Sequence, residues 1–508
     1  MRKLNLKPFG HLFLFLYLPM VLVSCAEKEK KQEETVLSGK QLLDIQCASC
    51  HLTPKPETLD KTTWKLHVLP RMGYMMGFRN QPKAAIGAFN DEGEGERIGE
   101  ETSLYLATKT PSFSQENWQK LQEYILNLAP EKLPVGESKI EAYTKLFEAQ
   151  KVEMPFPRPS TTFTGFISPG HLISGDSNND GIIMHYDANL NVRKQDSVGI
   201  NLVHAKKYDG KYWLTHMGTS FAATDNPNGF ISQYSENGGV EKVVENLTRP
   251  VHTAFGDLSG NGETELLVSE FGKWTGRLSW YKKENGKYVG KDLISLPGAI
   301  RSEIADMNGD GLNDVIALFG QGDEAVYILY NQGNGKFNID KVLQFPPTYG
   351  STYFKMIDYN KDGFLDILYT AGDNGDYTPI AKPYHGIRVF TNDGQNRFKE
   401  KLFLPLYGAF RAIAEDFDQD GDLDFAAISY FPKYNKEFFV FRENLGNNWF
   451  MPKIVKDVNI GRWMTMDSFD YDDDGDLDLV LGSYDWEQNS VSKEDIVPLV
   501  YLRNTLIE

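Results

Sequence analysis

The sequence predicts a multidomain protein in which a small all-α domain is followed by an all-β ring of seven blades. The chain of 508 residues is too long for one ordinary core. Apolar residues recur at helical spacing between residues 115 and 128. From residue 161 to residue 508, short apolar runs recur instead at intervals of roughly 43 to 58 residues, which is the spacing of propeller blades.

The helical region covers residues 38–134. Residues 40–46 have the apolar spacing of a short helix. A longer helix is expected between Ser114, which can cap its start, and Pro130, which ends it. Residues 135–160 are expected to form a linker, with a short helix over residues 137–149 and a proline-rich end.

Seven apolar runs predict the seven blades of the region 161–508. Most are followed by an aromatic strand and a Gly/Asn turn, as in Tyr327–Phe337 and Val389–Phe398, which is typical of a β-hairpin. Closing the blades into a ring hides the sheet edges. We expect residues near Phe163 to complete the last blade. The runs are Leu172–Gly175, Tyr212–Gly218, Leu266–Gly272, Val315–Gly320, Ile367–Gly372, Phe425–Tyr430 and Leu479–Tyr484.

The N-terminus has the pattern of an export signal. Basic residues precede an apolar run that is too short to span a bilayer as a helix, so we expect residues 1–24 to be a cleaved signal peptide. Leu22–Cys25 resembles the lipobox of bacterial lipoproteins, which implies that Cys25 carries the lipid anchor. Residues 25–37, rich in Glu and Lys, are expected to form a flexible tether. Ala26, which follows the expected lipid-bearing cysteine, gives no evident inner-membrane retention signal, so we expect an outer-membrane lipoprotein that faces the periplasm or the cell surface.

The other two cysteines belong to Cys47–His51, which reads Cys-Ala-Ser-Cys-His. Two thiols at this spacing suit the vinyl groups of one haem, with His51 as the proximal iron ligand. The alternatives are a redox-active cysteine pair, which favours a βαβ context, and half of a zinc site, for which no second pair exists. Residues 38–134 resemble a c-type cytochrome domain. The resemblance implies one haem c, attached covalently through Cys47 and Cys50.

The sixth iron ligand is expected to be Met72. Leu69–Gly73 is expected to be a loop, about where small cytochromes supply a methionine. Met75, Met76 and His67 are the alternatives. A methionine ligand would raise the haem potential, whereas a second histidine would lower it.

Five segments of the ring region share one acidic pattern. Oxygen-bearing side chains stand at positions 1, 3 and 5, Gly at position 6 permits a sharp turn, and an acid at position 9 closes the shell, as a calcium loop requires. The predicted ligands are Asp257, Ser259, Asn261 and Glu265; Asp306, Asn308, Asp310 and Asp314; Asp358, Asn360, Asp362 and Asp366; Asp416, Asp418, Asp420 and Asp424; and Asp470, Asp472, Asp474 and Asp478.

These loops and their strands resemble the FG-GAP/VCBS repeats of seven-bladed β-propellers. The resemblance covers about residues 160–508 and implies about four or five structural Ca²⁺ ions. The alternative is a set of ordinary Asp/Gly turns without metal. Asp176–Gly181 has a similar composition, but it follows its apolar run, so we expect a hairpin turn there. The first two blades therefore depart from the family pattern.

A further set of residues stands five positions before the first Asp of each loop, or before Asp209 in the second blade. Equivalent positions gather around the axis of a propeller. Four of them form a possible ligand site for an anion, a sugar acid or an acidic partner. The alternative is that these residues connect neighbouring blades. The positions are His204, His252, Arg301, Tyr353, Arg411 and Thr465, and the possible ligand residues are His204, His252, Arg301 and Arg411.

The predicted function is electron transfer through one haem, with the propeller as a calcium-stabilised scaffold that docks a redox partner protein or a small-molecule substrate. The net charge of −17 argues against nucleic acid. The alternative is a propeller oxidoreductase, similar to a sugar or alcohol dehydrogenase, that passes electrons to its own haem domain. A propeller polysaccharide lyase with a fused cytochrome is a third hypothesis. The catalytic residues of either enzyme remain unknown.

Overall fold

The computed structural model describes most of the region after residue 36. The expected signal peptide 1–24, the expected lipid-bearing Cys25 and the tether up to residue 36 lie outside the described residues. Within the described part, no helix has the length and apolar character needed to cross a membrane. The described ranges are 37–81, 109–137, 140–155, 160–177, 181–219, 224–237, 239–375, 380–434, 436–458, 461–485 and 497–507.

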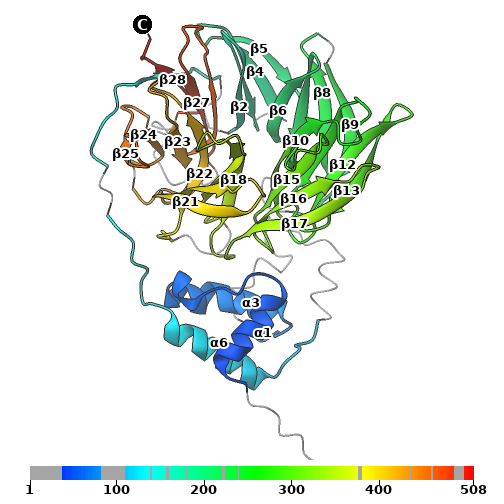
Figure 1. Ribbon diagram of the computed structural model, residues 1–508, viewed down its shortest axis with the longest axis vertical. Coiled ribbons are helices and arrows are strands. Elements are labelled where there is room, and N and C mark those ends of the chain that lie inside the picture. The colour runs from blue at the N-terminus through cyan, green and yellow to red at the C-terminus, as the bar shows by residue number, and fades with distance from the viewer. Residues whose placement is uncertain are drawn as a thin grey trace, which may run out of the picture. The chain divides into compact units, whose positions relative to one another are not determined.

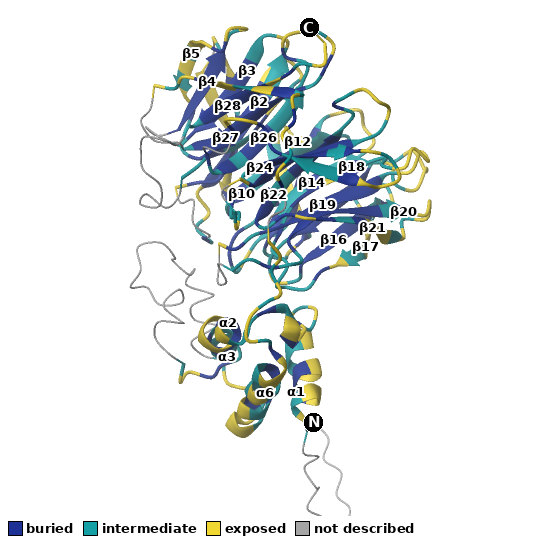
Figure 2. Ribbon diagram, turned by 90° about the vertical axis from the view of Figure 1, so that its left-hand side faces the viewer, coloured by how far each residue is buried: buried dark blue, intermediate teal, exposed yellow. Residues whose placement is uncertain are grey.

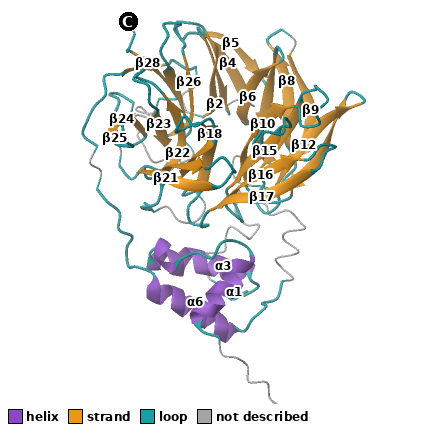
Figure 3. Cartoon of the chain, in the orientation of Figure 1, coloured by secondary structure: helices purple, strands orange, loops and turns teal. Residues whose placement is uncertain are grey.

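Helices are found in the described residues before the propeller (Figure 3). Ser38 starts the first helix with a capping box, in which Ser38 N–H donates to Gln41 Oε1 at 2.9 Å. Ser114 accepts a bond from Asn117 N–H at 3.2 Å, which confirms the predicted helix start. The helical elements are α1 (Gly39–Gln46), the 3₁₀ turns η1 (Cys47–Ser49) and η2 (Pro56–Thr58), α2 (Lys61–Thr63), the π-helical turn η3 (Trp64–Val68), α3 (Leu69–Met75) and α6 (Gln115–Leu128).

Helices α1 and α6 cross at close range. A Cβ atom built on Gly39 would lie 2.4 Å from Tyr124 Cβ, so only glycine fits at this crossing. Trp118 of α6 is buried and stacks on Phe78 with ring centroids 5.3 Å apart. The apolar stripe predicted for α6 is therefore its packing face.

The rest of the described chain forms seven four-stranded antiparallel sheets, the blades of a propeller (Figure 1). Blades 1 to 3 contain β2 (Thr161–Ser168), β3 (His171–Asp176), β4 (Ile182–Tyr186) and β5 (Val192–Ser197); β6 (Leu202–Tyr208), β7 (Lys211–His216), β8 (Gly229–Ser235) and β9 (Gly239–Leu247); and β10 (Pro250–Gly256), β11 (Glu265–Glu270), β12 (Arg277–Glu284) and β13 (Lys287–Ile294).

Blades 4 to 6 repeat this order. They contain β14 (Ala299–Ala305), β15 (Asp314–Phe319), β16 (Ala325–Asn331) and β17 (Phe337–Gln344); β18 (Ser351–Ile357), β19 (Asp366–Ala371), β20 (Gly386–Asn392) and β21 (Phe398–Pro405); and β22 (Ala409–Glu415), β23 (Asp424–Ser429), β24 (Phe439–Asn444) and β25 (Phe450–Lys453). Blade 7 contains β26 (Trp463–Phe469), β27 (Asp478–Ser483), β28 (Leu499–Asn504) and β1 (Phe147–Lys151).

The first strand of each blade lines the centre of the ring, because the first strands of successive blades contact one another. The second strands hold the predicted apolar runs, and β11, β15, β19, β23 and β27 are buried throughout. The fourth strands, such as β13 and β17, are largely exposed, and Figure 2 shows this for β5. The seven runs therefore correctly predicted seven blades.

The ring closes differently from the prediction. Strand β1 pairs with β28, with Phe147 opposite Asn504 and Lys151 opposite Val500. The expected linker 135–160 thus contains the outer strand of blade 7, and the short helix expected over residues 137–149 is wrong. Phe163 lies instead in the inner strand of blade 1. Pairing with an open sheet edge outweighs the weak strand propensity of the Glu, Ala and Lys residues in β1.

Candidate functional site

The Cys-Ala-Ser-Cys-His segment begins where α1 ends. Cys47 opens η1 and is half-buried, Cys50 is exposed, and both thiols are free. Burial raises the pKa of the Cys47 thiol to about 11, and the neighbouring Cys50 adds to this shift. His51 Nδ1 lies 3.0 Å from the carbonyl oxygen of Leu52. Because a carbonyl only accepts, Nδ1 is the donor of this bond, which in the neutral imidazole leaves the lone pair on Nε2.

The candidate sixth ligands lie near one another in the chain. Met72 is half-buried within α3, so the expected loop over Leu69–Gly73 is wrong. Pro70 stands at the start of α3, where a proline is compatible with a helix. Met75 ends α3 and is half-buried, and His67 is exposed in η3.

Each Asp-rich segment forms the loop between the first and second strands of a blade. In blade 4, Asp306 accepts backbone N–H bonds from Gly309 and Gly311, both at 2.8 Å. Gly311 has a φ of 82°, which explains the glycine at position 6. Asp306 and Asn308 also line an open groove of about 630 Å³, so the loop faces solvent.

The other loops have the same backbone fold. In each, the first Asp accepts the N–H of the glycine five residues later, at 2.7 to 3.1 Å. The pairs are Asp257 with Gly262, Asp358 with Gly363, Asp416 with Gly421, and Asp470 with Gly475.

Carboxylates converge in the loops of blades 6 and 7. In blade 6 these are the three aspartates at positions 416, 418 and 420, whose ligand atoms all lie within 4.8 Å of one another. Asp470, Asp472 and Asp474 form the same group in blade 7. Burial, together with the neighbouring acids, raises the pKa of Asp472. A cation would relieve the repulsion within each group.

The acid at position 9 is held by the protein backbone. Asp314 Oδ2 accepts Met307 N–H at 2.9 Å, and Oδ1 accepts Asn331 N–H at 2.7 Å. Asp424 accepts one such bond, from Asn444 N–H at 2.8 Å, while its Oδ2 has no hydrogen-bond partner among the described residues. Burial raises the pKa of Asp424 to about 7, with the nearby loop acids adding to the shift.

A repeated asparagine completes the loops of blades 4 to 7, and sequence reasoning did not identify its role. It ends the third strand of blades 4 to 7 and donates through Nδ2 to loop carbonyl oxygens. Asn504, for example, reaches Phe417 O at 2.9 Å and Leu477 O at 3.2 Å. The available signal was the Asn-x-Gly spacing at residues 331, 392 and 444, of which the first two lie in the segments that predict hairpin turns.

The proposed channel residues share the same position in the strand register of their blades. The inner strand of every blade has an irregular register near its start, and the first residue after it is the proposed channel position. Such bulges re-aim side chains. Blade 1 has the same irregularity before Phe163, which extends the six predicted positions to seven.

The channel residues contact one another. The His204 and His252 rings lie 4.4 Å apart, and Arg301 and Arg411 lie over the Tyr353 ring at 4.9 and 5.1 Å. Burial, reinforced by Arg301, lowers the pKa of His204 to about 3 and that of His252 well below its usual value. Both imidazoles are therefore neutral at pH 7.

Some of these cations are already paired. Arg301 forms an ion pair with Glu303 at 3.3 Å. Thr465 bonds Thr164 of blade 1 at 3.0 Å, so this position connects blades. Arg411 Nε is buried and has no hydrogen-bond partner among the described residues. Some channel residues therefore connect neighbouring blades, while the Arg411 guanidinium can donate a hydrogen bond from Nε to a bound ligand.

Blades 1 and 2 have only short turns in place of the acidic loops. Gly170 lies in the turn of blade 1 with a φ of 63°, and Asp209 and Gly210 form that of blade 2. Asp176 is a buried part of β3, and residues 178–180 of the predicted hairpin turn lie outside the described residues. Among the described residues, the Asp-rich loop with this backbone fold is thus found in blades 3 to 7.

Comparisons with solved structures match this chain to proteins of low sequence identity. Virginiamycin B lyase from Staphylococcus aureus is 12% identical, with 71% of this chain and 100% of that chain covered and a TM-score of 0.46. A streptogramin B lyase structure is 13% identical, covering 71% and 98%, with a TM-score of 0.45. The computationally designed Ika8 protein is 10% identical, covering 70% and 98%, with a TM-score of 0.41.

The sequence comparisons are more limited. No curated protein matched the sequence. The profile of the FG-GAP-like repeat matches residues 306–369, which run from the first Asp of the blade 4 loop into the second strand of blade 5. The chain is therefore a seven-bladed β-propeller that contains an FG-GAP-like repeat.

Proposed function

We propose that the protein is a lipid-anchored c-type cytochrome that transfers electrons through one covalent haem, with its propeller as a calcium-stabilised docking scaffold. The observation that carries this proposal is the arrangement of Cys47, Cys50 and His51. Two free thiols follow one helix, and the adjacent imidazole leaves Nε2 available. This donor set fits a c-type haem.

Further features of the helical region support the fit. The bond from His51 Nδ1 to Leu52 O fixes both the tautomer and the ring orientation, as is usual for a histidine that binds a metal through its other nitrogen. Ile45 and Leu52 flank the segment and are 53% and 37% exposed, so they offer apolar surface that a macrocycle would cover. When bound, a haem supplies one-electron chemistry. Met72 is the proposed sixth ligand, and Met75, Met76 and His67 are its competitors.

The acidic loops support the scaffold role. Five loops with one backbone fold occur at the same place in blades 3 to 7. Ca²⁺ prefers this set of oxygen ligands, and an ion bound only by the folded chain stabilises it. The propeller would then present a rigid surface to a redox partner.

The envelope location rests on the sequence around Cys25, which implies an outer-membrane lipoprotein facing the periplasm or the cell surface. A Cys25→Ala variant expressed in a bacterial host should lose lipid labelling and appear in the soluble fraction. Labelling that persists in this variant would contradict the anchor.

Stopped-flow spectroscopy tests the electron carrier. The reduced protein should exchange electrons with soluble redox proteins, and panels of sugars and alcohols should leave the oxidised haem unchanged. If the reduced protein exchanged electrons with none of the redox proteins tested, the proposed electron-carrier function would be contradicted.

The second candidate is a propeller oxidoreductase. It is favoured by the neutral His204–His252 pair beside Arg411 in the channel. Reduction of the haem by one small substrate, lost in His252→Ala and retained in Asn338→Ala outside the channel, would support this enzyme over the carrier.

A further inference from the structure

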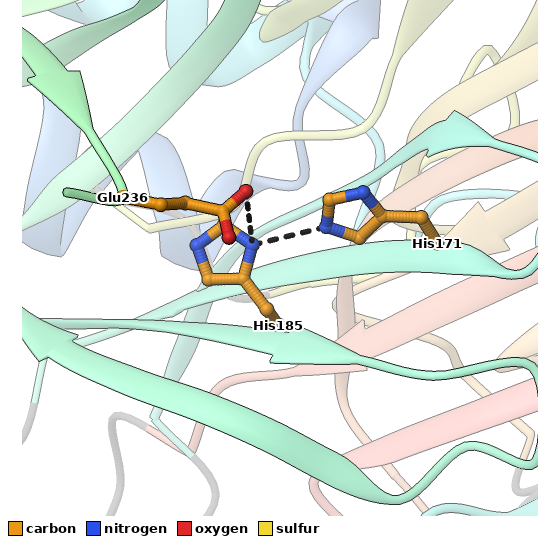
Figure 4. Close-up of side chains that lie close together, drawn as sticks. All are labelled: His171, His185 and Glu236. Atoms are coloured by element: carbon orange, nitrogen blue, oxygen red, sulfur yellow. Dashed lines mark hydrogen bonds and ion pairs between the residues drawn. The ribbon is translucent and has the colours of Figure 1, made fainter.

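Three potential metal ligands meet between blades 1 and 2. His171 opens β3, His185 lies in β4, and Glu236 follows β8 of the next blade (Figure 4). Ile173 faces His185 in the sheet, so the two histidines are diagonal neighbours on one face. The ligand atoms of all three side chains lie within 4.8 Å of one another.

Hydrogen bonding determines the tautomer of His185. Its Nε2 lies 3.2 Å from Tyr234 Oη. The Tyr234 hydroxyl donates to Asp196, a carboxylate that also pairs with Lys194 at 2.9 Å. Since the hydroxyl proton is used there, His185 Nε2 must donate to Tyr234 Oη. His185 Nδ1 therefore keeps its lone pair.

His171 also directs a lone pair into the cluster. Arg193 Nη2 lies 3.0 Å from His171 Nε2, and a guanidinium can only donate, so Nε2 accepts. His171 Nε2 and His185 Nδ1, both acceptors, face one another at 3.0 Å, and Glu236 Oε1 lies 3.8 Å from His185 Nδ1. Two lone pairs and a carboxylate that meet in one place favour a cation there, and the Arg193 guanidinium supplies the positive charge in this structure.

We propose that His171, His185 and Glu236 bind one divalent transition-metal ion, Zn²⁺ by preference, that joins blades 1 and 2. Two imidazoles and one carboxylate form a zinc ligand set that leaves one coordination position for water. Ligand atoms on a tetrahedral Zn²⁺ lie about 3.3 Å apart. The distances of 3.0 and 3.8 Å fall on either side of that spacing.

The position of this cluster fits a role in joining blades. In blade 4, Asn331 ends the third strand and bonds Leu258 O of the preceding blade. Glu236 immediately follows the third strand of blade 2 and reaches the preceding blade in the same way. Blades 1 and 2 lack the acidic loops, so this ion would connect the part of the ring that calcium does not.

Arg193 is the competitor of the metal. Its guanidinium contacts His171 at 3.0 Å and Glu236 at 3.3 Å, and its side chain is 43% exposed. An exposed arginine can move outward when an ion enters. If the cluster is a metal site, removal of the positive charge of Arg193 should strengthen metal binding. If the cluster is held together only by the ion pairs of Arg193, the same removal should weaken it.

The test is a titration of the full mature protein with ZnCl₂ in saturating Ca²⁺, by calorimetry and elemental analysis. The wild type should bind one Zn²⁺ per chain in addition to the Ca²⁺ ions proposed for the acidic loops. Glu236→Gln and His171→Gln should weaken this binding at least about tenfold, since even indirect partners of a metal site contribute that much. Glu241→Gln, an exposed site in the same blade, is the matched control and should bind normally.

Arg193→Ala supplies the second arm. It should bind Zn²⁺ more tightly than the wild type, and Zn²⁺ should raise its melting temperature further. X-ray absorption at the zinc edge should show two imidazole ligands. Uptake that is equal in the wild type, Glu236→Gln and His171→Gln overturns the proposal. Failure of both the wild type and Arg193→Ala to bind Zn²⁺ overturns it as well.

Discussion

The side-chain amide of Asn331 donates a hydrogen bond across a blade boundary to the backbone carbonyl of Leu258, 2.7 Å away. The backbone N–H of the same residue donates to Asp314 at 2.7 Å. One asparagine thus connects the acidic loop of its own blade to the loop of the preceding blade. The same residue type ends the third strand of blades 5 to 7.

Replacing this asparagine should weaken the ring. Asn331→Ala leaves the buried carbonyl of Leu258 without its donor, which costs about 1–3 kcal/mol of unfolding free energy. Chemical denaturation measures the loss. Asn338→Ala on the exposed face of β17 is the control and should change stability by less than about 0.5 kcal/mol. Equal losses in the two variants would contradict the connection.

Calcium removal should destabilise the propeller. A chelator should lower the melting temperature, since ions bound only to the folded chain stabilise it. Asp472→Asn, at position 3 of the blade 7 loop, should reduce this calcium effect. Asp473→Asn, at the adjacent exposed position that the pattern does not use, should retain it. The ion is not bound as proposed if both variants respond to calcium like the wild type.

Glu324 should make stability depend on pH. Its carboxylate accepts bonds from Ser351 N–H at 3.0 Å and Oγ at 2.7 Å, yet burial raises its pKa from 4.5 to about 7. The folded state therefore binds more protons than the unfolded state between these values, and stability falls as pH rises through this window.

The Glu324→Gln variant removes this titration. It should match the wild type near pH 4.5 and gain up to about 3 kcal/mol relative to it above pH 7. Denaturation curves across this range measure the difference. If the difference in unfolding free energy between the two proteins were the same at all pH values, the pKa of Glu324 would not change on folding.

The proposed role of Met72 as the sixth haem ligand can be tested by comparing its alanine variant with those of the neighbouring methionines. Met72→Ala should lower the haem potential and weaken the low-spin spectrum, because a thioether ligand raises the potential. Potentiometry and visible absorption follow the change. Met75→Ala and Met76→Ala are the matched controls. An effect confined to one of the controls would move the ligand to that residue.

The repeating parts of this fold were predictable, because each blade carries the same local signals. The residues of an apolar second strand such as Val315–Gly320 are sufficient to predict that strand, and the same holds for the Asp-rich loops. The channel positions followed as well, since the bulge before His252 recurs at a constant distance from each loop.

The non-repeating parts were not predictable. Strand β1 is defined by its pairing with β28, which is distant in the sequence, and its own residues do not favour a strand. His171, His185 and Glu236 show no regular spacing in the sequence. A hairpin and the packing of two blades bring them together.

The most direct test of the account is the mass and colour of the mature protein from a host that attaches c-type haem. The mature protein should carry the added mass of one haem, which should be retained after denaturation and lost in the Cys47→Ser, Cys50→Ser double variant. A colourless protein with the mass of the polypeptide and its lipid alone would contradict it.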